Sequence, residues 1–167
     1  MTEGLKILIV EDEIILAEDL KARLNRMGYN IIGIADSFNS AMTTLYHHRT
    51  DLILVDISLR GKKTGIDLAH KVNQEFQLPF IFLTSHADKY TVQQANKANP
   101  YAYLLKPFND KQIDIAIELA ITNFAQRTDQ FKSKTSDSSE GKRERVIKNG
   151  LFLKNRNHYQ RVRLDAI

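Results

Sequence analysis

Five side chains suited to phosphoryl chemistry stand at the ends of four short apolar runs. Glu11 and Asp12 follow the first run, and Asp56 follows the second. Thr84 follows the third, and Lys106 follows the fourth. Three carboxylates brought together repel one another unless a cation offsets their charge. Mg²⁺ meets this need, because it binds one or two carboxylates together with phosphate oxygens.

The same groups could also hold a phosphoryl group. A carboxylate can attack phosphorus and form an aspartyl phosphate. The ammonium of Lys106 can pair with one phosphoryl oxygen, and the hydroxyl of Thr84 can donate a hydrogen bond to another. The residue types therefore indicate a magnesium-assisted phosphoryl site, provided that the fold brings them to one place.

The four apolar runs predict the strands that would position these groups. The runs cover residues 5–10, 52–55, 80–83 and 101–105. Nearly continuous apolar runs are typical of strands in a parallel sheet that helices cover on both faces. In such sheets, ligands bind outside the carboxyl ends of the strands. We therefore expect the five side chains to meet at one edge of a sheet.

A fifth strand and five helices complete the predicted fold. Residues 29–35 have strand-like patterning. Helical spacing of apolar residues predicts helices near residues 17–27, 38–45, 66–72 and 113–124, and residues 88–98 are expected to form a further, mostly polar helix. Gly28 suits the end of the first helix, and Asn109 with Gln112 forms a capping-box pattern before the fifth. The alternation predicts a doubly wound α/β fold of the flavodoxin-like (βα)5 type, with a five-stranded parallel sheet in the order 2-1-3-4-5.

Composition is ordinary for a soluble globular protein. Of the 167 residues, 43% are hydrophobic and 26% are charged. The absence of Cys excludes disulfides and thiolate metal sites and favours a reducing compartment. No apolar stretch approaches the roughly 20 residues of a membrane helix, and no secretory signal is visible. We expect a cytoplasmic protein without a membrane partner.

The composition changes after Phe124. Residues 128–142 are rich in Ser, Thr, Lys and Asp, with Phe131 as their one apolar side chain, which predicts a linker. Strand-like patterning returns in residues 146–153 and 159–164. This end is too short to form a core alone, so we expect it to open a second domain that the chain does not contain.

The predicted domain limits are therefore 4–125 for the α/β domain, 126–145 for a flexible linker and 146–167 for the incomplete second domain. Charge is unevenly distributed between these parts. Residues 1–126 hold 13 Lys and Arg against 15 Asp and Glu, whereas residues 127–167 hold 11 against 5. A basic tail fits a polyanionic partner and, equally well, a solvated surface.

Five short motifs surround the candidate residues in a specific order. They are ILIVEDE at 7–13, LILVDISLRG at 52–61, GIDLA at 65–69, FLTSHAD at 82–88 and YLLKPF at 103–108. Asp12, Asp56, Thr84 and Lys106 are separated by 44, 28 and 22 residues. With these motifs in this order, residues 4–125 resemble the receiver domain of two-component response regulators.

The resemblance implies a role for each acidic residue. Asp56 would be the phosphoacceptor, and a histidine kinase would be the phosphoryl donor. Asp12 and Asp56 would be the side-chain ligands of Mg²⁺. The backbone carbonyl of Ser58 would be a further ligand, and Glu11 would contribute through water.

The resemblance also implies a conformational switch. Thr84 and Lys106 would hold the phosphoryl group, and Tyr103 would swing inward as Thr84 moves toward it. The Lys106–Pro107 peptide bond is expected to be cis. The surface formed by the fourth helix, the fifth strand and the fifth helix would carry the output and offer a face for homodimer formation.

Two features depart from the family pattern. Leu59 and Arg60 stand where a Met-Pro pair often follows the acceptor, which predicts a looser loop before Gly61. By the same resemblance, Ser58 and His86 would occupy the two positions that face the phosphoryl group and tune its lifetime.

Two other functions fit parts of the pattern. A phosphatase of the haloacid dehalogenase type also uses an Asp nucleophile and Mg²⁺, but it needs a second Asp where this chain has Ser58. A degenerate receiver that acts only as a binding module would be expected to lack Asp12, Asp56 or Lys106, and all three are present. The sequence therefore favours a phosphorylation switch over an enzyme.

Residues 146–167 resemble the start of a LytTR-type DNA-binding domain. An apolar-Lys turn is followed by Tyr159 and by alternating basic and apolar residues that lead to Asp165 and Ile167. The resemblance implies a transcriptional regulator that reaches DNA through the missing part of that domain. We expect the chain itself to bind DNA weakly or not at all. The alternative is a receiver that acts through protein–protein interaction without DNA binding.

Overall fold

The computed structural model describes residues 4–85, 88–133, 151–155 and 158–162. The chain divides into two compact units, Met1–Lys132 and Ser133–Ile167.

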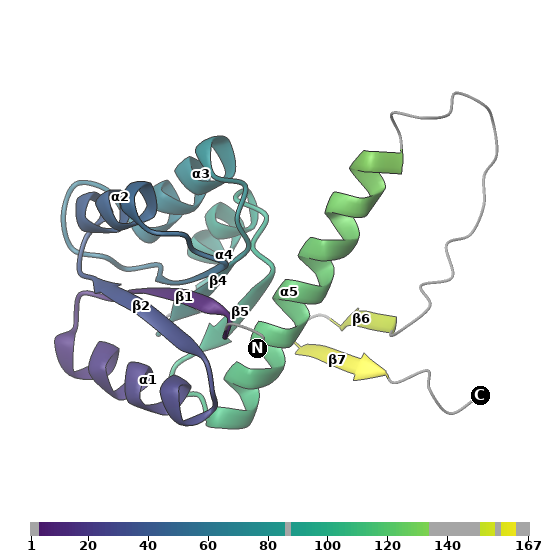
Figure 1. Cartoon of the computed structure of the whole chain (residues 1–167), viewed down its shortest axis with the longest axis horizontal. Helices are drawn as coiled ribbons and strands as arrows, with labels where there is room; N and C mark the ends of the chain where they lie inside the picture. Colours follow the sequence, from purple (N-terminus) through teal and green to yellow (C-terminus); the bar gives the residue numbers. More distant parts are fainter. Residues whose placement is uncertain (1–3, 86–87, 134–150, 156–157, 163–167) are drawn as a thin grey trace. The chain divides into compact units, whose positions relative to one another are not determined.

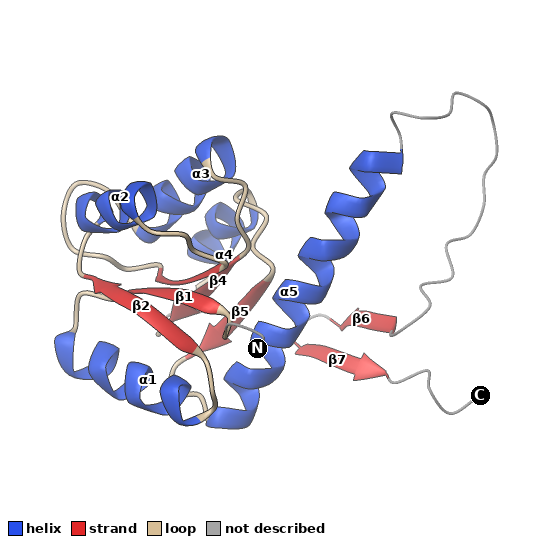
Figure 2. Ribbon diagram, in the orientation of Figure 1, coloured by secondary structure: helices blue, strands red, loops and turns tan. Residues whose placement is uncertain are grey.

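The first unit is built on a five-stranded parallel sheet (Figure 2). Its strands lie in the order β2-β1-β3-β4-β5, which confirms the predicted order. The strands are β1 (Lys6–Val10), β2 (Asn30–Ala35), β3 (Leu52–Asp56), β4 (Phe80–Thr84) and β5 (Ala102–Leu105). Because all five are parallel, their carboxyl ends lie along one edge of the sheet.

Five helices cover the two faces of this sheet, as predicted (Figure 1). One face packs against α2, α3 and α4, and the other packs against α1 and α5. The helices are α1 (Ile14–Arg26), α2 (Phe38–His47), α3 (Gly65–Glu75), α4 (Lys89–Asn96) and α5 (Asp110–Ser133).

The alternation of side chains along each strand supplies both halves of the core. On β1, Leu8 and Val10 face α2, α3 and α4, whereas Ile7 and Ile9 face α1 and α5. All four side chains are fully buried. Burial of one such side chain contributes about 1.5–3 kcal/mol relative to exposure. Two-sided burial explains why the strands are continuous apolar runs rather than alternating ones.

Local sequence signals fix several helix ends. Gly28 follows α1 with φ of 90°, which confirms its predicted place beyond the end of that helix. The amide of Gln112 donates to the Asn109 side chain at 2.8 Å, and the amide of Asn109 donates back to the Gln112 side chain at 2.8 Å. The predicted capping box is therefore present, and it fixes the start of α5 just after Lys106 and the loop that follows it.

The end of α5 differs from the sequence-based expectation. The helix continues to Ser133, so residues 126–133 of the predicted linker are helical. This segment has no Gly or Pro, and adding turns to an existing helix avoids the cost of nucleation. The Thr128 hydroxyl donates to the Phe124 carbonyl at 2.9 Å. None of the described helices is both long and apolar enough to cross a membrane.

The second unit contains one antiparallel pair of strands. Strand β6 (Leu151–Asn155) pairs with β7 (His158–Val162). Each overlaps a segment with predicted strand patterning, 146–153 for β6 and 159–164 for β7. Residues 134–145 of the predicted linker lie outside the described residues, as do residues 146–150 and 163–167 of the segment that resembles a LytTR-type domain.

Candidate phosphoryl and metal site

The structure brings the five predicted residues to the carboxyl edge of the sheet. Glu11 and Asp12 follow β1, and Asp56 is the last residue of the neighbouring strand β3. Thr84 is the last residue of β4. Lys106 follows β5, and its amide donates to the Thr84 carbonyl at 2.8 Å.

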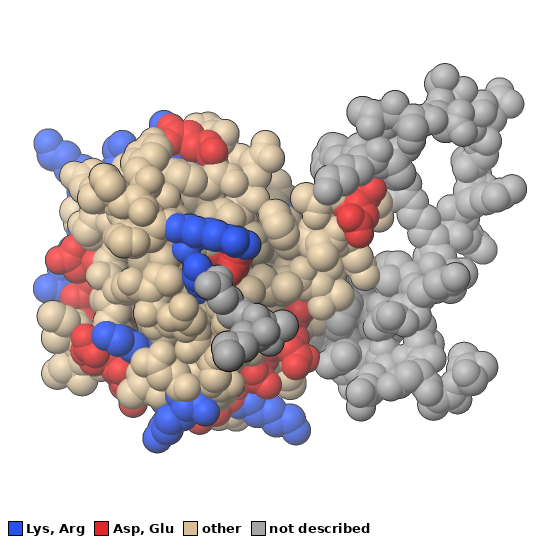
Figure 3. Space-filling view, viewed as in Figure 1, with Lys and Arg blue, Asp and Glu red and all other residues tan. Residues whose placement is uncertain are grey.

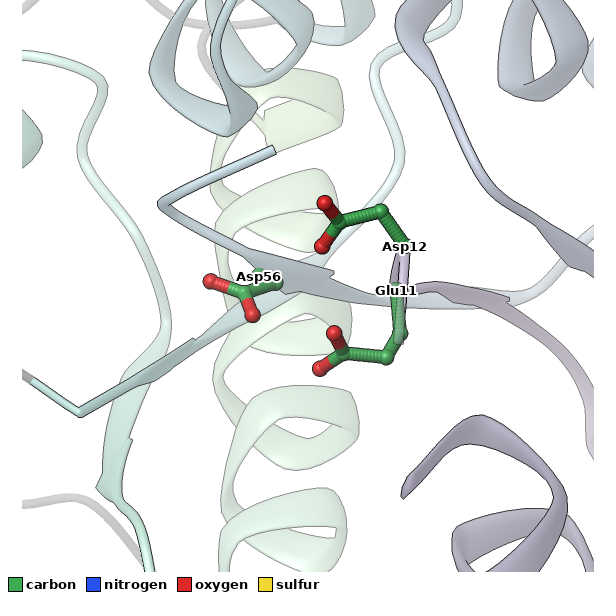
Figure 4. Close-up of side chains that lie close together, drawn as sticks. All are labelled: Glu11, Asp12 and Asp56. Atoms are coloured by element: carbon green, nitrogen blue, oxygen red, sulfur yellow. The ribbon is translucent and has the colours of Figure 1, made fainter. Parts of the chain in front are cut away.

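The three carboxylates form one cluster at this edge (Figure 4). Glu11, Asp12 and Asp56 each have a carboxylate oxygen within 4.8 Å of the others. Glu11 is only 2% exposed and Asp56 only 6% exposed. Oxygen donors at this spacing suit a hard divalent ion, which fits the predicted Mg²⁺.

Lys106 joins two of these acids. Its Nζ donates to Glu11 Oε2 at 2.5 Å and to Asp56 Oδ2 at 2.7 Å. Burial lowers the pKa of the Lys106 ammonium, but the hydrogen bonds to Asp56 and Glu11 outweigh this effect, so the pKa lies above its ordinary value. Lys106 is therefore positively charged at neutral pH.

Glu11 responds differently to the same surroundings. Burial raises the pKa of its carboxyl, and the hydrogen bonds from Lys106 and from the Glu13 amide offset only part of this increase. The Glu13 amide lies 3.1 Å from Glu11 Oε1. Glu11 thus favours its proton more than an exposed Glu does, chiefly because the charged form loses solvation on burial.

The Asp56 carboxylate is oriented from two sides. The Ser58 amide donates to Oδ1 at 2.7 Å, and Lys106 donates to Oδ2. Ser58 itself is exposed, so its backbone lies beside the acceptor at the surface. The carboxylate is held in one orientation by a backbone donor and an ammonium donor.

Asp12 has a different cationic partner. Arg60 Nε lies 2.9 Å from Asp12 Oδ2. The Arg60 side chain is 81% exposed, and the Asp12 side chain is 11% exposed. Sequence reasoning noted Arg60 only as a departure from a Met-Pro pattern. Its positive charge, four positions after Asp56, was the signal that could have suggested this contact.

Known proteins identify the family to which this site belongs. A family model described as response regulator receiver domain matches residues 7–118. The chain belongs to this family. It contains the receiver domain of a two-component response regulator, as the motifs predicted.

Curated relatives of this receiver domain are named as transcriptional regulators. PdtaR of Mycobacterium tuberculosis is 33% identical over 123 residues, which are 74% of this chain and 60% of PdtaR. LytR of Staphylococcus aureus is 34% identical over 115 residues, which are 68% of this chain and 46% of LytR. The chain therefore matches less than two thirds of the length of either relative.

Solved receiver domains share the fold. The signal receiver domain of a modulated diguanylate cyclase from Desulfovibrio desulfuricans is 34% identical, with a TM-score of 0.71. The match covers 75% of this chain and 99% of that domain. The N-terminal domain of a response regulator/sensory box/GGDEF three-domain protein from Carboxydothermus hydrogenoformans is 30% identical, with a TM-score of 0.68, and the match covers 74% of this chain and 98% of that domain.

The predicted switch residues of the receiver domain lie where the motifs put them. Thr84 is 5% exposed at the carboxyl edge. Tyr103 is half-buried on β5, with its ring 5.7 Å from the Phe82 ring, and its hydroxyl donates to Asn96 of α4 at 2.9 Å. The Lys106–Pro107 peptide bond is cis, as predicted. His86 lies outside the described residues.

Gly65 is a residue of the receiver site that sequence reasoning did not assign. A Cβ at this position would lie 1.9 Å from the Asp56 carbonyl oxygen. The Gly65 amide donates to the Ile57 carbonyl at 3.1 Å, so α3 begins directly against the end of β3. The GIDLA motif contained this residue, but only the fold shows that its lack of a side chain leaves room for the backbone carbonyl of Asp56.

Proposed function

We propose that Asp56 accepts a phosphoryl group from a histidine kinase. A carboxylate oxygen of Asp56 forms a bond to phosphorus while the P–N bond to the kinase imidazole breaks, and the imidazole keeps the electron pair of that bond. The observation that carries the proposal is the setting of Asp56. It is a carboxylate oriented by an amide and an ammonium, and it lies beside two further acids.

Lys106 supplies the charge that the phosphorylated state needs. Its raised pKa keeps the ammonium charged, and its 2.7 Å contact with Asp56 Oδ2 places that charge where phosphoryl oxygens would lie. The hydroxyl of Thr84, at the end of the next strand, would donate to another phosphoryl oxygen. Two strands on the same side of β3 thus supply both donors.

The acid cluster fits a magnesium ion. Asp12 and Asp56 would bind it through side chains, Ser58 through its carbonyl and Glu11 through water. The ion would supply positive charge to the carboxylates and to the phosphoryl oxygens. This assignment rests on the oxygen donors and their mutual distances.

Exposed apolar side chains near Asp56 would form a binding surface for a kinase. Ile14, Ile15 and Leu16 begin α1 directly after the acid pair and are 72%, 81% and 42% exposed. Leu105, next to Lys106, is 55% exposed. Exposed apolar side chains near a charged site are typical of a protein-binding surface. They support the histidine kinase as the partner.

Phosphorylation of Asp56 would change the surface formed by α4, β5 and α5, and this surface would act on the output. The hydrogen bond from Tyr103 of β5 to Asn96 of α4 links two parts of this face, so an inward swing of Tyr103 would release α4. We propose that this face controls a transcriptional output, in part through homodimer formation. The DNA-binding region would begin near residue 146 and be of the LytTR type. The names of the relatives LytR and PdtaR support a transcriptional output.

Phosphorylation by a small donor tests the proposal. The full chain is incubated with acetyl phosphate and Mg²⁺, and its intact mass is measured. We expect a gain of one phosphoryl group that Asp56→Asn abolishes. Asp129→Asn, which removes an exposed carboxylate from α5, should keep the gain. A wild-type chain that gains no mass, or an Asp56→Asn variant that still does, would contradict the proposal.

A further inference from the structure

Arg60 places a second cation in the acid cluster. It lies in the loop between β3 and α3, and its guanidinium reaches across to Asp12, which follows β1. Lys106 pairs with Glu11 and Asp56. Each of the three carboxylates therefore has a cationic side-chain partner, although the cluster also has the donors and spacing for a divalent ion.

The two cations differ in how firmly they are held. Lys106 is 14% exposed and contacts two buried carboxylates. Arg60 is 81% exposed and contacts Asp12 alone among the three acids. An exposed ion pair is worth little, because water and salt screen it and two long side chains must be ordered. Arg60 can therefore be displaced into solvent far more easily than Lys106.

Arg60 and a metal ion would compete for the carboxylate of Asp12. A guanidinium stays protonated at any physiological pH, so its positive charge cannot be removed by titration. Its Nε lies 2.9 Å from Asp12 Oδ2, and Asp12 is also one of the three acids whose carboxylate oxygens cluster. The ion and Arg60 would also repel each other.

We propose that Arg60 is an internal counter-ion of Asp12 that a divalent cation must displace, so that Arg60 sets the Mg²⁺ concentration at which the site fills. This inference rests on the proposed function, because it assumes that Asp12 is a metal ligand. It assigns a role to a residue at which the chain departs from the Met-Pro pattern.

A neighbouring lysine provides a matched control. Lys63 belongs to the same loop, but its Nζ lies over the Phe38 ring, 4.2 Å from the ring centroid. Lys63→Ala removes the same unit of charge as Arg60→Ala and leaves the Asp12 contact in place. A comparison of the two variants separates competition at Asp12 from the general effect of net charge.

The test is a Mg²⁺ titration of the full chain, monitored by NMR through the backbone amide signals of Glu13 and Ser58. These amides donate to Glu11 and Asp56, so they report on the occupied cluster without any phosphorylation. We expect Arg60→Ala to lower the Mg²⁺ dissociation constant by about two- to five-fold relative to Lys63→Ala, the range set by an exposed ion pair. Arg60→Lys should return the constant toward the wild-type value.

The possible outcomes distinguish the inference from the proposed function. If the wild type binds Mg²⁺ and Arg60→Ala binds it no more tightly than Lys63→Ala, the role of Arg60 is wrong and the metal site stands. If the wild type does not bind Mg²⁺, both fail. Asp12→Asn should abolish or greatly weaken binding, which checks that the titration reports on this cluster. Because Arg60 is largely exposed, its substitution should leave the fold intact, as circular dichroism can confirm.

Discussion

At the scale of single residues, the site is governed by a balance between acids and cations. Two buried carboxylates, Glu11 and Asp56, share one ammonium. Removing a partner from a buried polar group is costly, because the group left behind has already lost its water. Lys106 therefore has a structural effect as well as a proposed role toward the phosphoryl group.

Lys106→Met tests this balance. We expect the free energy of unfolding to fall by about 1–3 kcal/mol at neutral pH, because the two acids lose their shared donor. The pKa of Lys106 in the folded chain lies above its ordinary value of 10.5. Its stabilising contribution is therefore complete below that value and is lost as pH rises through the folded pKa. Urea unfolding of both proteins at a series of alkaline pH values measures the difference.

The difference in stability between wild type and Lys106→Met should be constant near neutral pH and shrink above pH 10.5. Tyrosines and the acids that do not contact Lys106 are the same in both proteins, so their titrations cancel in the comparison. A difference in stability that grew with pH would show that the charge of Lys106 is not the source of its stabilising effect.

At the scale of elements, the close approach of α3 to β3 positions the acceptor. The first residue of α3, Gly65, lies against the carbonyl of Asp56, and a side chain there would overlap that oxygen. Thr64 caps the helix by accepting a hydrogen bond from the Asp67 amide, which fixes where α3 begins. The end of β3, the start of α3 and the acceptor Asp56 are therefore packed directly against one another.

Gly65→Ala should disturb this packing of α3 against β3. Because the new Cβ would lie 1.9 Å from the Asp56 carbonyl oxygen, backbone must move. We expect a loss of about 1–3 kcal/mol in the free energy of unfolding, as for overpacking in a core, together with slower phosphorylation by acetyl phosphate. Urea unfolding and intact mass against time measure the two effects.

Gly33→Ala is the matched control for this substitution. Gly33 lies on β2, and a Cβ there would be 3.9 Å from Thr44 Cγ2, which is ordinary contact. Its stability should stay close to that of the wild type, and its phosphorylation should be unchanged. Equal losses in the two variants would mean that the position beside Asp56 has no special constraint.

At the scale of the whole molecule, the sequence predicted the element order, the strand order and the edge where Glu11, Asp12 and Asp56 meet. Burial on both faces requires apolar side chains along β1, β3 and β4, so these strands are apolar runs in the sequence, and the candidate polar residues stand at or just after their carboxyl ends. The contact of Arg60 with Asp12 depends on how one loop folds, which no periodicity encodes. The end of α5 was predicted too early. The polar residues after Phe124 were interpreted as a linker, but polar residues can extend an existing helix without packing against a hydrophobic core.

The charge pattern of the first unit gives no further guide to partners. Figure 3 shows basic and acidic side chains interspersed over the visible face of that unit. Residues 1–126 hold nearly equal numbers of both signs, and the excess of basic residues lies in 127–167. A polyanionic partner would therefore be sought through the C-terminal part of the chain rather than through the α/β unit.

The end of α5 also decides where the first unit can be separated from the rest. Arg127 lies over the Tyr101 ring, 4.7 Å from its centroid, and Tyr101 in turn contacts the Phe124 ring at 6.0 Å. These contacts belong to residues on both sides of the predicted limit at 125. The extended helix therefore stabilises the α/β unit itself.

Two shortened chains test this conclusion. A chain ending at Ser133 should have the same free energy of unfolding as the full chain, because the division into two units falls there. A chain ending at Ala125 should be less stable by about 0.5–1 kcal/mol, the usual value of an exposed cation–π contact, with some further fraying of α5. Arg127→Ala in the chain ending at Ser133 should reproduce most of that loss. Equal stability of the two shortened chains would show that the last turns of α5 do not support the first unit, and the predicted limit at 125 would then describe the stable domain.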